Sequence, residues 1–231
     1  MNEPGATVAV RVWDVPTRLF HWSLAALVTA SLVTGKFDSV LGATTLEWHR
    51  RFGYAILGLV AFRLVWGFAG GTHARFDSFL KGPAAVLAYA RAMRGREHPV
   101  SVGHNPLGGW SVVAMIVAVA AQAVTGLFLV QEDYGFTGPL ARFVSNAASG
   151  RLGAFHEANF WVIAGLVGLH LAAIATHAVA FGENLVAAMF SGTKRLPGAF
   201  ASHAGRAGGL AGLAVAMAAA AAVVFALVRL G

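Results

Sequence analysis

Residues 155–170 have the sequence FHEANFWVIAGLVGLH, and this stretch decides the fold. From Glu157 to Glu183 the chain carries no other charged residue. A helix rises 1.5 Å and turns about 100° per residue, so His156 and His170 would stand about 21 Å apart and within about 40° of one face. A membrane-spanning helix needs about 20 mostly apolar residues. The stretch therefore predicts one spanning helix that presents an imidazole near each membrane surface.

The composition of the whole chain agrees with a membrane protein. Hydrophobic residues make up 57% of the 231 residues and charged residues only 12%, whereas soluble domains carry about 25% charged residues. The absence of cysteine excludes a disulfide scaffold, a thiolate zinc site, an iron–sulfur cluster and covalently attached c-type haem. A net charge of +7 in so apolar a chain favours the lipid bilayer over nucleic acid as a partner.

Apolar runs elsewhere in the chain indicate four more spans. Charge-free runs lie between Arg18 and Lys36, Glu97 and Glu132, and Arg206 and Arg229, and the run Phe52–Gly71 is interrupted only by Arg63. We therefore predict helices at 18–36, 47–69, 108–130, 155–181 and 208–229. The expected fold class is an all-α integral membrane protein, a four-helix transmembrane bundle with a fifth, C-terminal transmembrane helix. That last helix is rich in Ala and Gly, which favours a packing role through close backbone approach.

The distribution of Lys and Arg predicts the orientation. One set of flanks holds ten basic residues and the other holds six, so the positive-inside rule places the N-terminus in the cytoplasm and the C-terminus in the periplasm. The loop at about 70–107 is then cytoplasmic. Within it, Pro83–Arg94 is either an irregular basic loop or a short amphipathic helix on the bilayer. In the helical case the residues facing lipid would be Val86, Leu87, Tyr89 and Met93.

Besides His177, which lies near the end of its span, four histidines fall within the spans, where ionisable side chains are costly and usually functional. His49 and His156 lie at the periplasmic level, and His21 and His170 share the cytoplasmic level. These matched depths predict two bis-histidine sites stacked across the membrane, and imidazole pairs from facing helices commonly hold haem iron. A zinc or copper site requires three or four clustered ligands, and the sequence pattern indicates no such cluster. A single histidine inside the membrane could serve an interhelical hydrogen bond, but this alternative does not explain four histidines at matched depths.

Other histidines compete less well as ligands. His177 follows His170 by seven residues, but its use would place the two sites about 31 Å apart, nearly the full hydrocarbon thickness. We therefore favour His170 and place His177 at the membrane interface. His104 precedes Asn105–Pro106, which we expect to cap the third span; a role near the inner haem or in proton transfer is the alternative. The remaining loop histidines are His73, His98 and His203.

Arginines near the predicted sites are candidates to hold haem propionates. Arg63 follows His49 by 14 residues and reaches the level of the inner histidines. A buried guanidinium is costly unless it is paired, and a propionate would pair with it through charge-assisted bonds. The alternative is that Arg63 snorkels to the interface. Arg18 would serve the inner haem in the same way, and Arg50 or Arg51 the outer one.

Glycines and polar residues in the spans have two interpretations each. Glycines would leave the gaps that a flat macrocycle needs, or would serve helix packing; they are Gly53, Gly126, Gly165 and Gly168. The polar candidates for a quinone site are His104, Gln122 and Thr125, although interhelical hydrogen bonding explains them as well.

Five segments of the chain resemble a known family. They are VWDVPTRLFHW (12–22), EWHRRFGY (47–54), GHNPLGGW (103–110), FHEANFWVIAGLVGLH (155–170) and ENLVAAMFSGTKR (183–195). In these the chain is similar to the bacterial cytochrome b561 group, which includes the membrane b-type cytochrome subunit of nickel–iron hydrogenases. The resemblance implies a core at 1–195 that holds two b haems on His21, His49, His156 and His170. Residues 196–231, with the fifth helix, lie outside that core.

The resemblance also implies a function in the bacterial inner membrane. Electrons would pass between a quinone pool and a periplasmic redox protein, such as a hydrogenase or a c-type cytochrome. An alternative is a stand-alone enzyme that oxidises superoxide at the periplasmic face and reduces quinone. In that case basic residues would steer the anion towards the outer haem; the candidates are Lys36, Arg50, Arg51 and Arg151. A haem-free transporter would leave the matched histidine depths without explanation.

Overall fold

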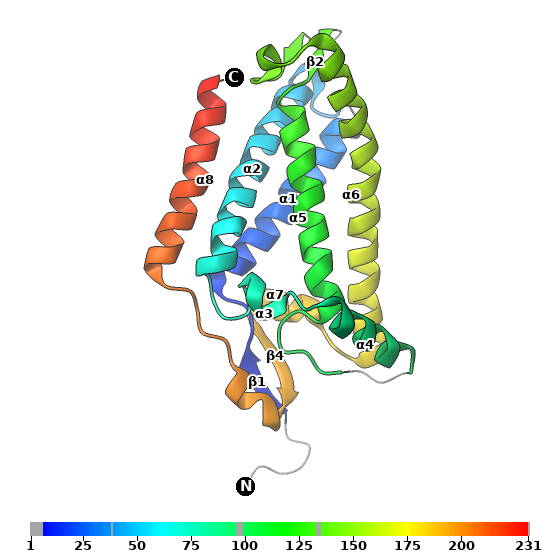
Figure 1. Cartoon of the computed structure of the whole chain (residues 1–231), viewed down its shortest axis with the longest axis vertical. Helices are drawn as coiled ribbons and strands as arrows, with labels where there is room; N and C mark the ends of the chain where they lie inside the picture. Colours follow the sequence, from blue (N-terminus) through cyan, green and yellow to red (C-terminus); the bar gives the residue numbers. More distant parts are fainter. Residues whose placement is uncertain (1–6, 38, 96–98, 133–134, 231) are drawn as a thin grey trace. The chain divides into compact units, whose positions relative to one another are not determined.

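A computed structural model describes residues 7–37, 39–95, 99–132 and 135–230 of the chain. The long helices are α1 (Val15–Lys36), α2 (Thr45–Ala69), α5 (Pro106–Gly126), α6 (Asn146–Phe181) and α8 (Leu210–Leu230), labelled in Figure 1. The short helices are α3 (Phe76–Phe79), α4 (Pro83–Arg94) and α7 (Leu185–Ser191). The strands are β1 (Thr7–Arg11), β2 (Val130–Gln131), β3 (Phe136–Thr137) and β4 (Thr193–Pro197), and the 3-10 turns are η1 (Gly42–Thr44), η3 (Ala141–Phe143) and η4 (Gly198–His203).

All five predicted spans are helical. Within the described residues, four helices are long and apolar enough to cross a membrane: α2 with its preceding turn, α5, α6 and α8. Helix α1 has 22 residues, which is sufficient length, but it is not among these four helices. The chain is thus a mainly helical membrane protein, and the crossing by α1 stays a prediction.

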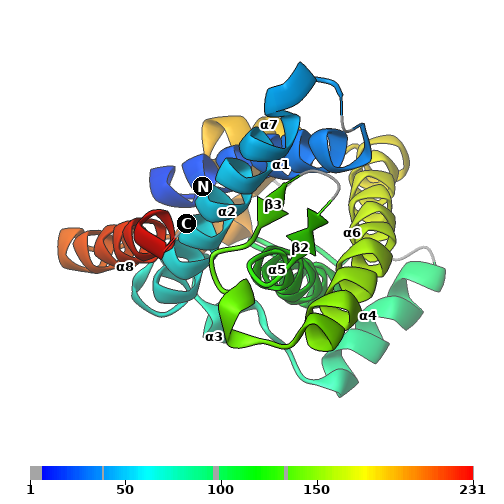
Figure 2. The ribbon, with the colours of Figure 1, turned by 90° about the horizontal axis from the view of Figure 1, so that it is seen from above.

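Two helix ends differ from those expected. Helix α5 ends at Gly126 instead of residue 130, because Val130 and Gln131 pair with Phe136 and Thr137 in a short ladder (Figure 2). Helix α6 begins at Asn146, nine residues earlier than expected, where the Ser145 hydroxyl accepts the Ala148 N–H at 3.3 Å and caps the first turn. His156 therefore stands in the third turn of its helix rather than at its opening.

The expectation of an all-α chain needs one addition, which is a pair of small antiparallel ladders. Besides β2 and β3, strand β1 pairs with β4 in a register that runs from Thr7 opposite Pro197 to Arg11 opposite Thr193. Helix α7 leads into β4: the Asn184 side chain accepts the Ala187 N–H at its start. Gly192 ends it with φ +82°, a conformation that favours glycine.

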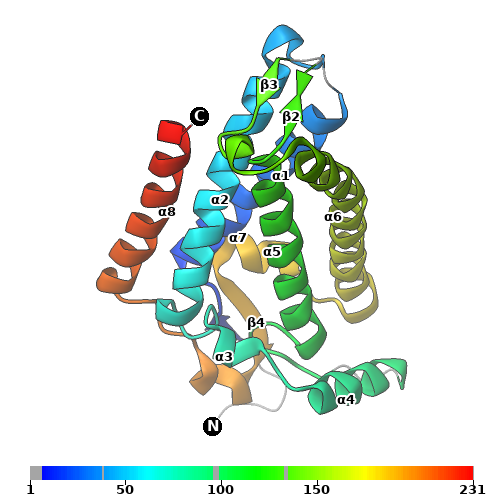
Figure 3. The same ribbon diagram turned by 45° about the horizontal axis from the view of Figure 1, so that its top comes forward.

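Of the two alternatives for residues 83–94, the helix is correct (Figure 3). The residues on its buried face differ from the set that we expected to share one apolar face. Tyr89 is buried, with 7% exposure, and Val86 and Met93 are half-buried, whereas Leu87 is exposed. The spacing of these positions explains the correction, because positions 86, 89 and 93 share one face of a helix while 87 is turned about 100° from 86. Tyr89 therefore packs against protein and does not face lipid.

The chain divides into two compact units, and each is described by itself. The first unit comprises Met1–Leu19, Val65–Val113 and Gly168–Ala214. The second comprises Phe20–Leu64, Ala114–Val167 and Val215–Gly231. Each of the five long helices contributes residues to both units.

Helix α8 packs closely on α2, as its small residues lead us to expect. In the second unit, a Cβ on Gly58 would lie 2.7 Å from Val224 and 3.3 Å from the carbonyl oxygen of Ala220. In the first unit, a Cβ on Gly212 would lie 2.9 Å from the side chain of Ala69. Leu227 is buried in the core cluster of the second unit with Tyr54, Leu57 and Leu127. Glycine at these contacts allows the backbones to approach.

Candidate functional site

Two imidazoles meet in the second unit. His49 on α2 and His156 on α6 have ring centroids 6.3 Å apart, and their planes cross at 72°. The structure thus brings together the two histidines that were matched in depth at the predicted periplasmic level. Their sequence separation is more than 100 residues, so the fold and not local sequence places them side by side.

The spacing of these rings suits a metal held between them. A metal–imidazole bond is about 2 Å long, and the ring nitrogen lies roughly 1 Å from the ring centre, so two imidazoles on one metal have centroids roughly 6 Å apart. Within the described part of the chain, no three His, Cys, Asp or Glu side chains cluster closely enough to hold a metal ion. The pair therefore fits a metal that brings its own equatorial ligands, as haem iron does.

A threonine hydroxyl orients the His49 ring. Thr34 Oγ1 lies 3.1 Å from His49 Nδ1 and 2.8 Å from the carbonyl oxygen of Ala30. A hydroxyl has one proton, and a carbonyl oxygen only accepts. When that proton goes to Ala30, Oγ1 accepts from Nδ1–H. His49 then carries its proton on Nδ1, and its unprotonated Nε2 is the ring atom that could bind a metal.

The same arrangement holds His156. Thr125 Oγ1 lies 3.1 Å from His156 Nδ1 and 2.8 Å from the carbonyl oxygen of Ala121. The tautomer assignment is therefore the same as for His49. Partners of this kind fix the ring orientation of a metal-ligating histidine and raise its basicity.

Glycines face the edges of both rings. A Cβ on Gly35 would lie 2.9 Å from His49 Cε1, and one on Gly126 would lie 3.3 Å from His156 Cε1. The gap expected at Gly126 is therefore filled by an imidazole edge. Cβ atoms on Gly53, Gly165 or Gly168 would meet no described atom within 4 Å.

Hydrogen bonds between α5 and α6 fix the position of His156. Gln122 donates to the carbonyl oxygen of His156 at 3.0 Å, and Asn159 donates to Gln122 Oε1 at 2.8 Å and to the carbonyl oxygen of Ala118 at 2.9 Å. Of the two interpretations of Gln122 and Thr125, interhelical hydrogen bonding is the one observed. Both residues support the histidine.

The arginines expected at this site pair with a carboxylate on their own helix. Arg50 Nη2 lies 2.6 Å and Arg51 Nε 2.7 Å from the Glu47 carboxylate oxygens. Arg50 also lies over the Tyr54 ring, 5.8 Å from its centre. Glu47 thus gathers both guanidinium groups one turn or less from His49, and their propionate role stays a prediction.

Comparison with known proteins agrees with this geometry. Residues 12–192 match the family described as prokaryotic cytochrome b561. The chain belongs to the prokaryotic cytochrome b561 family. It is a membrane electron-transfer protein of the b type, for which the family implies haem b.

Curated relatives of this b561 chain carry a more specific name. It is 27% identical over 213 residues to a probable Ni/Fe-hydrogenase B-type cytochrome subunit of Rhodobacter capsulatus, a match that covers 80% of each chain. It is 24% identical over 216 residues to the probable Ni/Fe-hydrogenase B-type cytochrome subunit of Rhizobium leguminosarum bv. viciae, covering 80% of this chain and 89% of the relative. No solved structure is a significant match.

The remaining predicted site residues of the b561 chain lie in both units. In the second unit, His21 is half-buried beside the Trp22 ring, and Arg63 is buried with 3% exposure. Burial of Arg63 contradicts the snorkelling alternative, which needs an accessible guanidinium. In the first unit, His170 is half-buried, and Arg18 donates through Nη1 to the carbonyl oxygen of Phe190. The pairing of His21 with His170 stays a prediction.

His177 is buried, and its position at the membrane interface stays a prediction. Its Nδ1 lies 2.8 Å from Glu183 Oε2, and Lys194 Nζ lies 2.7 Å from Glu183 Oε1. Lys194 also donates to the carbonyl oxygen of Ser101 at 3.2 Å. Burial opposes ionisation of Glu183, but the hydrogen bonds and positive charges of Lys194 and His177 outweigh it and lower the pKa of that carboxyl. This cluster joins the end of α6 to β4.

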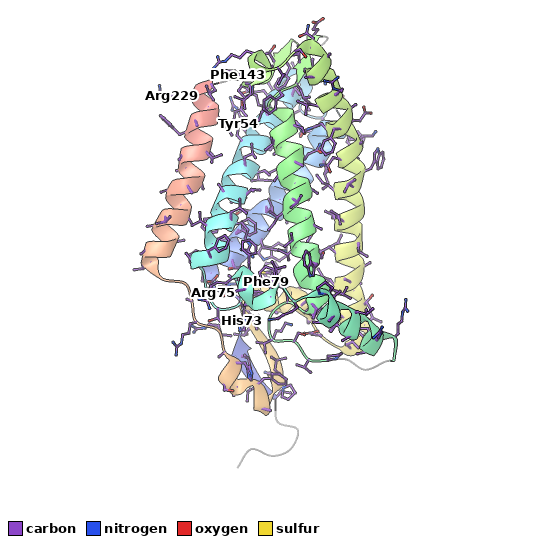
Figure 4. The ribbon with its side chains drawn as sticks, in the orientation of Figure 1. Tyr54, His73, Arg75, Phe79, Phe143 and Arg229 are labelled. Carbon is purple, nitrogen blue, oxygen red and sulfur yellow. The ribbon has the colours of Figure 1, made fainter. Side chains whose placement is uncertain are left out.

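His104 and His73 line a pocket of about 320 Å³ in the first unit. The His104 ring packs against Trp13 at 4.7 Å and Phe79 at 4.9 Å between centroids, and Lys81 and Ser101 complete the polar lining. His73 and Phe79 are labelled in Figure 4. As expected, Asn105 caps α5 by accepting the Gly108 N–H at 2.7 Å. His98 lies outside the described residues.

Sequence reasoning missed Thr34. A signal for it exists, because LVTGKF (32–37) and AVTGLF (123–128) share the triplet Val-Thr-Gly near the ends of two helices. The comparison of histidine depths uses only the position of each histidine along its own helix. It does not consider the side chains of the neighbouring helix, so it could not identify the Val-Thr-Gly repeat.

Proposed function

We propose that this chain is the electron-transferring membrane subunit of a respiratory complex in the bacterial inner membrane, with two bound b haems. It would connect a quinone pool with a periplasmic redox partner. The observation that carries the proposal is the His49–His156 pair, 6.3 Å apart with the Nδ1 atom of each ring next to a threonine hydroxyl. Membership of the b561 family agrees with it.

The residues that would hold the cofactors follow from their positions. His49 and His156 would hold the outer haem, with Arg50 and Arg51 as the residues that would bind its propionates. His21 and His170 would be the ligands of the inner haem, with Arg18 and Arg63 near its propionates. A buried guanidinium such as Arg63 is best stabilised by an anionic partner. A bound haem with two imidazole ligands supplies a one-electron carrier.

For the periplasmic partner, the relatives favour a hydrogenase, because they are named as hydrogenase cytochrome subunits. A c-type cytochrome is the other candidate. The N-terminus would lie in the cytoplasm and the C-terminus in the periplasm. For the quinone, we propose the pocket lined by His73, Lys81 and His104, because their N–H groups are donors for a quinone carbonyl.

A second candidate function is a stand-alone superoxide:quinone oxidoreductase. Lys36, Arg51 and Arg151 are exposed in the unit that contains the His49–His156 pair, as steering of a small anion requires. The ion pairs of Glu47 with Arg50 and Arg51 reduce the local positive charge. That observation favours the electron-transfer subunit.

The test uses the full chain purified with its native periplasmic partner and, separately, alone. We expect two low-spin haems per chain by haem assay and optical spectrum, and anaerobic reduction of both by a quinol or by the partner's electron donor. A chain with no bound haem would contradict the proposal. Rapid haem reduction by superoxide with the chain alone, and none by the partner, would favour the second function.

A further inference from the structure

Two helices of different sequence carry the same three-residue segment, and its threonine and glycine lie next to the two facing histidines. Val33-Thr34-Gly35 lies near the end of α1, and Val124-Thr125-Gly126 ends α5. We name these two segments the VTG triplets. The first faces His49 and the second faces His156, and all four segments belong to the second unit.

The threonines of the VTG triplets make the same pair of hydrogen bonds. Each hydroxyl lies 2.8 Å from the carbonyl oxygen four residues earlier and 3.1 Å from an imidazole Nδ1. Each hydroxyl also lies near the carbonyl oxygen three residues earlier, at 3.4 Å for Thr34 and 3.0 Å for Thr125. Both threonines are buried, with 7% and 8% exposure. The hydroxyl proton is thus directed to the backbone, which leaves the oxygen to accept from the ring.

The glycines of the VTG triplets allow the rings to lie against the helix. A side chain at Gly35 would come within 2.9 Å of His49 Cε1, a distance that real Cβ atoms essentially never show. At Gly126 the corresponding distance is 3.3 Å, which needs only a small shift. Each imidazole is therefore held on two sides, by a hydrogen bond at Nδ1 and by contact at Cε1.

We propose that the two VTG triplets are matched clamps that make His49 and His156 Nε2 ligands of one shared haem iron and set the reduction potential of that haem. The inference rests on the proposed function. Its threonines are positioning residues, because they act through the histidines and do not touch the cofactor.

The clamps have a defined electronic consequence. An acceptor at Nδ1–H makes the imidazole a stronger electron donor to the metal. A stronger donor stabilises the oxidised iron, so the clamped haem has a lower potential than it would with unsupported histidines. The crossed ring planes, at 72°, further predict a highly anisotropic low-spin ferric signal in electron paramagnetic resonance.

A general packing role for the VTG triplets does not account for these contacts. Thr176 on α6 makes the same backbone bond, to the carbonyl oxygen of Ala172 at 2.9 Å, but its side chain is exposed. Gly150 on α6 lies in the same unit, and a Cβ there would meet no described atom within 4 Å. These two residues are matched controls for the threonine and the glycine of a clamp.

The test compares Thr34→Val, Thr125→Val, Thr34→Ser and Thr125→Ser in the full chain, with Thr176→Val as control, by redox titration of each haem. Each valine variant should raise the ratio of reduced to oxidised haem at a fixed potential by roughly three- to tenfold. Both valine variants should affect the same haem and leave the other haem unchanged. The serine variants should restore the wild-type ratio, and Thr176→Val should not change it. The resonance signal of that haem should shift in the valine variants.

Glycine variants test the second contact independently. Gly35→Ala should lose most of that haem or make it high-spin, Gly126→Ala should have a smaller effect, and Gly150→Ala should retain it.

Several outcomes would contradict the proposed role of the VTG triplets without contradicting the proposed function. They are unchanged potentials in both valine variants, effects of Thr34 and Thr125 on different haems, or serine variants that behave like valine. The proposed function fails separately, when His49→Ala and His156→Ala retain both haems.

Discussion

Glu183 Oε1 lies 2.7 Å from Lys194 Nζ, and the other oxygen of the same carboxylate lies 2.8 Å from His177 Nδ1. One carboxylate thus balances a lysine whose side chain is only 7% exposed and a buried histidine. It lies where α6 gives way to α7 and β4, so it fixes the end of the helix that carries His156 and His170.

Replacing this carboxylate should destabilise the protein strongly. Glu183→Gln leaves the buried Lys194 ammonium without its counter-charge, which should cost on the order of 3 kcal/mol. Thermal unfolding in detergent measures the change. The control is Asp77→Asn. The Asp77 side chain is 76% exposed, and its Oδ1 lies as far as 3.6 Å from Arg75 Nε, so this variant should have little effect on stability. Equal effects of the two variants would show that the cluster carries no stability.

The lowered pKa of Glu183 predicts an acid limb of stability. A carboxyl whose pKa is lower in the folded state stabilises that state above its ordinary pKa of 4.5, and this contribution is lost as the pH falls through the folded pKa. The melting temperature should therefore fall below pH 4.5 more steeply for the wild type than for Glu183→Gln. Parallel curves for the two proteins would contradict this assignment.

Asp14 should be a second stabilising acid. Its Oδ1 accepts the Thr17 N–H at 3.0 Å, which caps α1, and its Oδ2 accepts the Gly71 N–H at 3.1 Å after α2. Asp14→Ala removes both acceptors from a buried position and should cost about 1–2 kcal/mol. Asp14→Asn keeps one acceptor and should lose less. Unfolding midpoints that rank the two variants the other way would refute the capping role.

The fifth helix should serve packing and not haem binding. Gly58→Val would collide with Val224 and Ala220 on α8, so it should lower the melting temperature and expose α8 to protease while the number of haems per chain stays unchanged. Gly150→Ala, where a Cβ meets no described atom within 4 Å, is the control. Loss of haem in Gly58→Val at a temperature where the protein is folded would assign α8 to the haem core.

The spans were predictable because they rest on a strong local signal. Charges are excluded from hydrocarbon, so charge-free runs located four of the five long helices, and a run interrupted only by Arg63 located α2. The ends were less predictable, because the apolar run continues beyond Gly126 through residues 127–130, and the Ser145 cap lies in a segment without periodic pattern. The β1–β4 ladder pairs Thr7 with Pro197, a contact that no local pattern encodes.

The candidate site was likewise predictable in part: the histidine pair could be predicted from the sequence, and the residues that support it could not. Helical rise alone placed His49 and His156 at one depth, and the structure brings them together. The acceptor Thr34 and the contact of Gly35 with His49 depend on how α1 is turned relative to α2. That rotation follows from tertiary packing, so a single-helix argument could not give it.

The most direct test of the account is the haem content of His49→Ala, His156→Ala and the double variant. If the two histidines share one iron, each single variant retains one low-spin haem per chain, and the double variant retains that same haem with an unchanged potential. A double variant that has lost both haems, or single variants that lose different haems, would contradict the shared site.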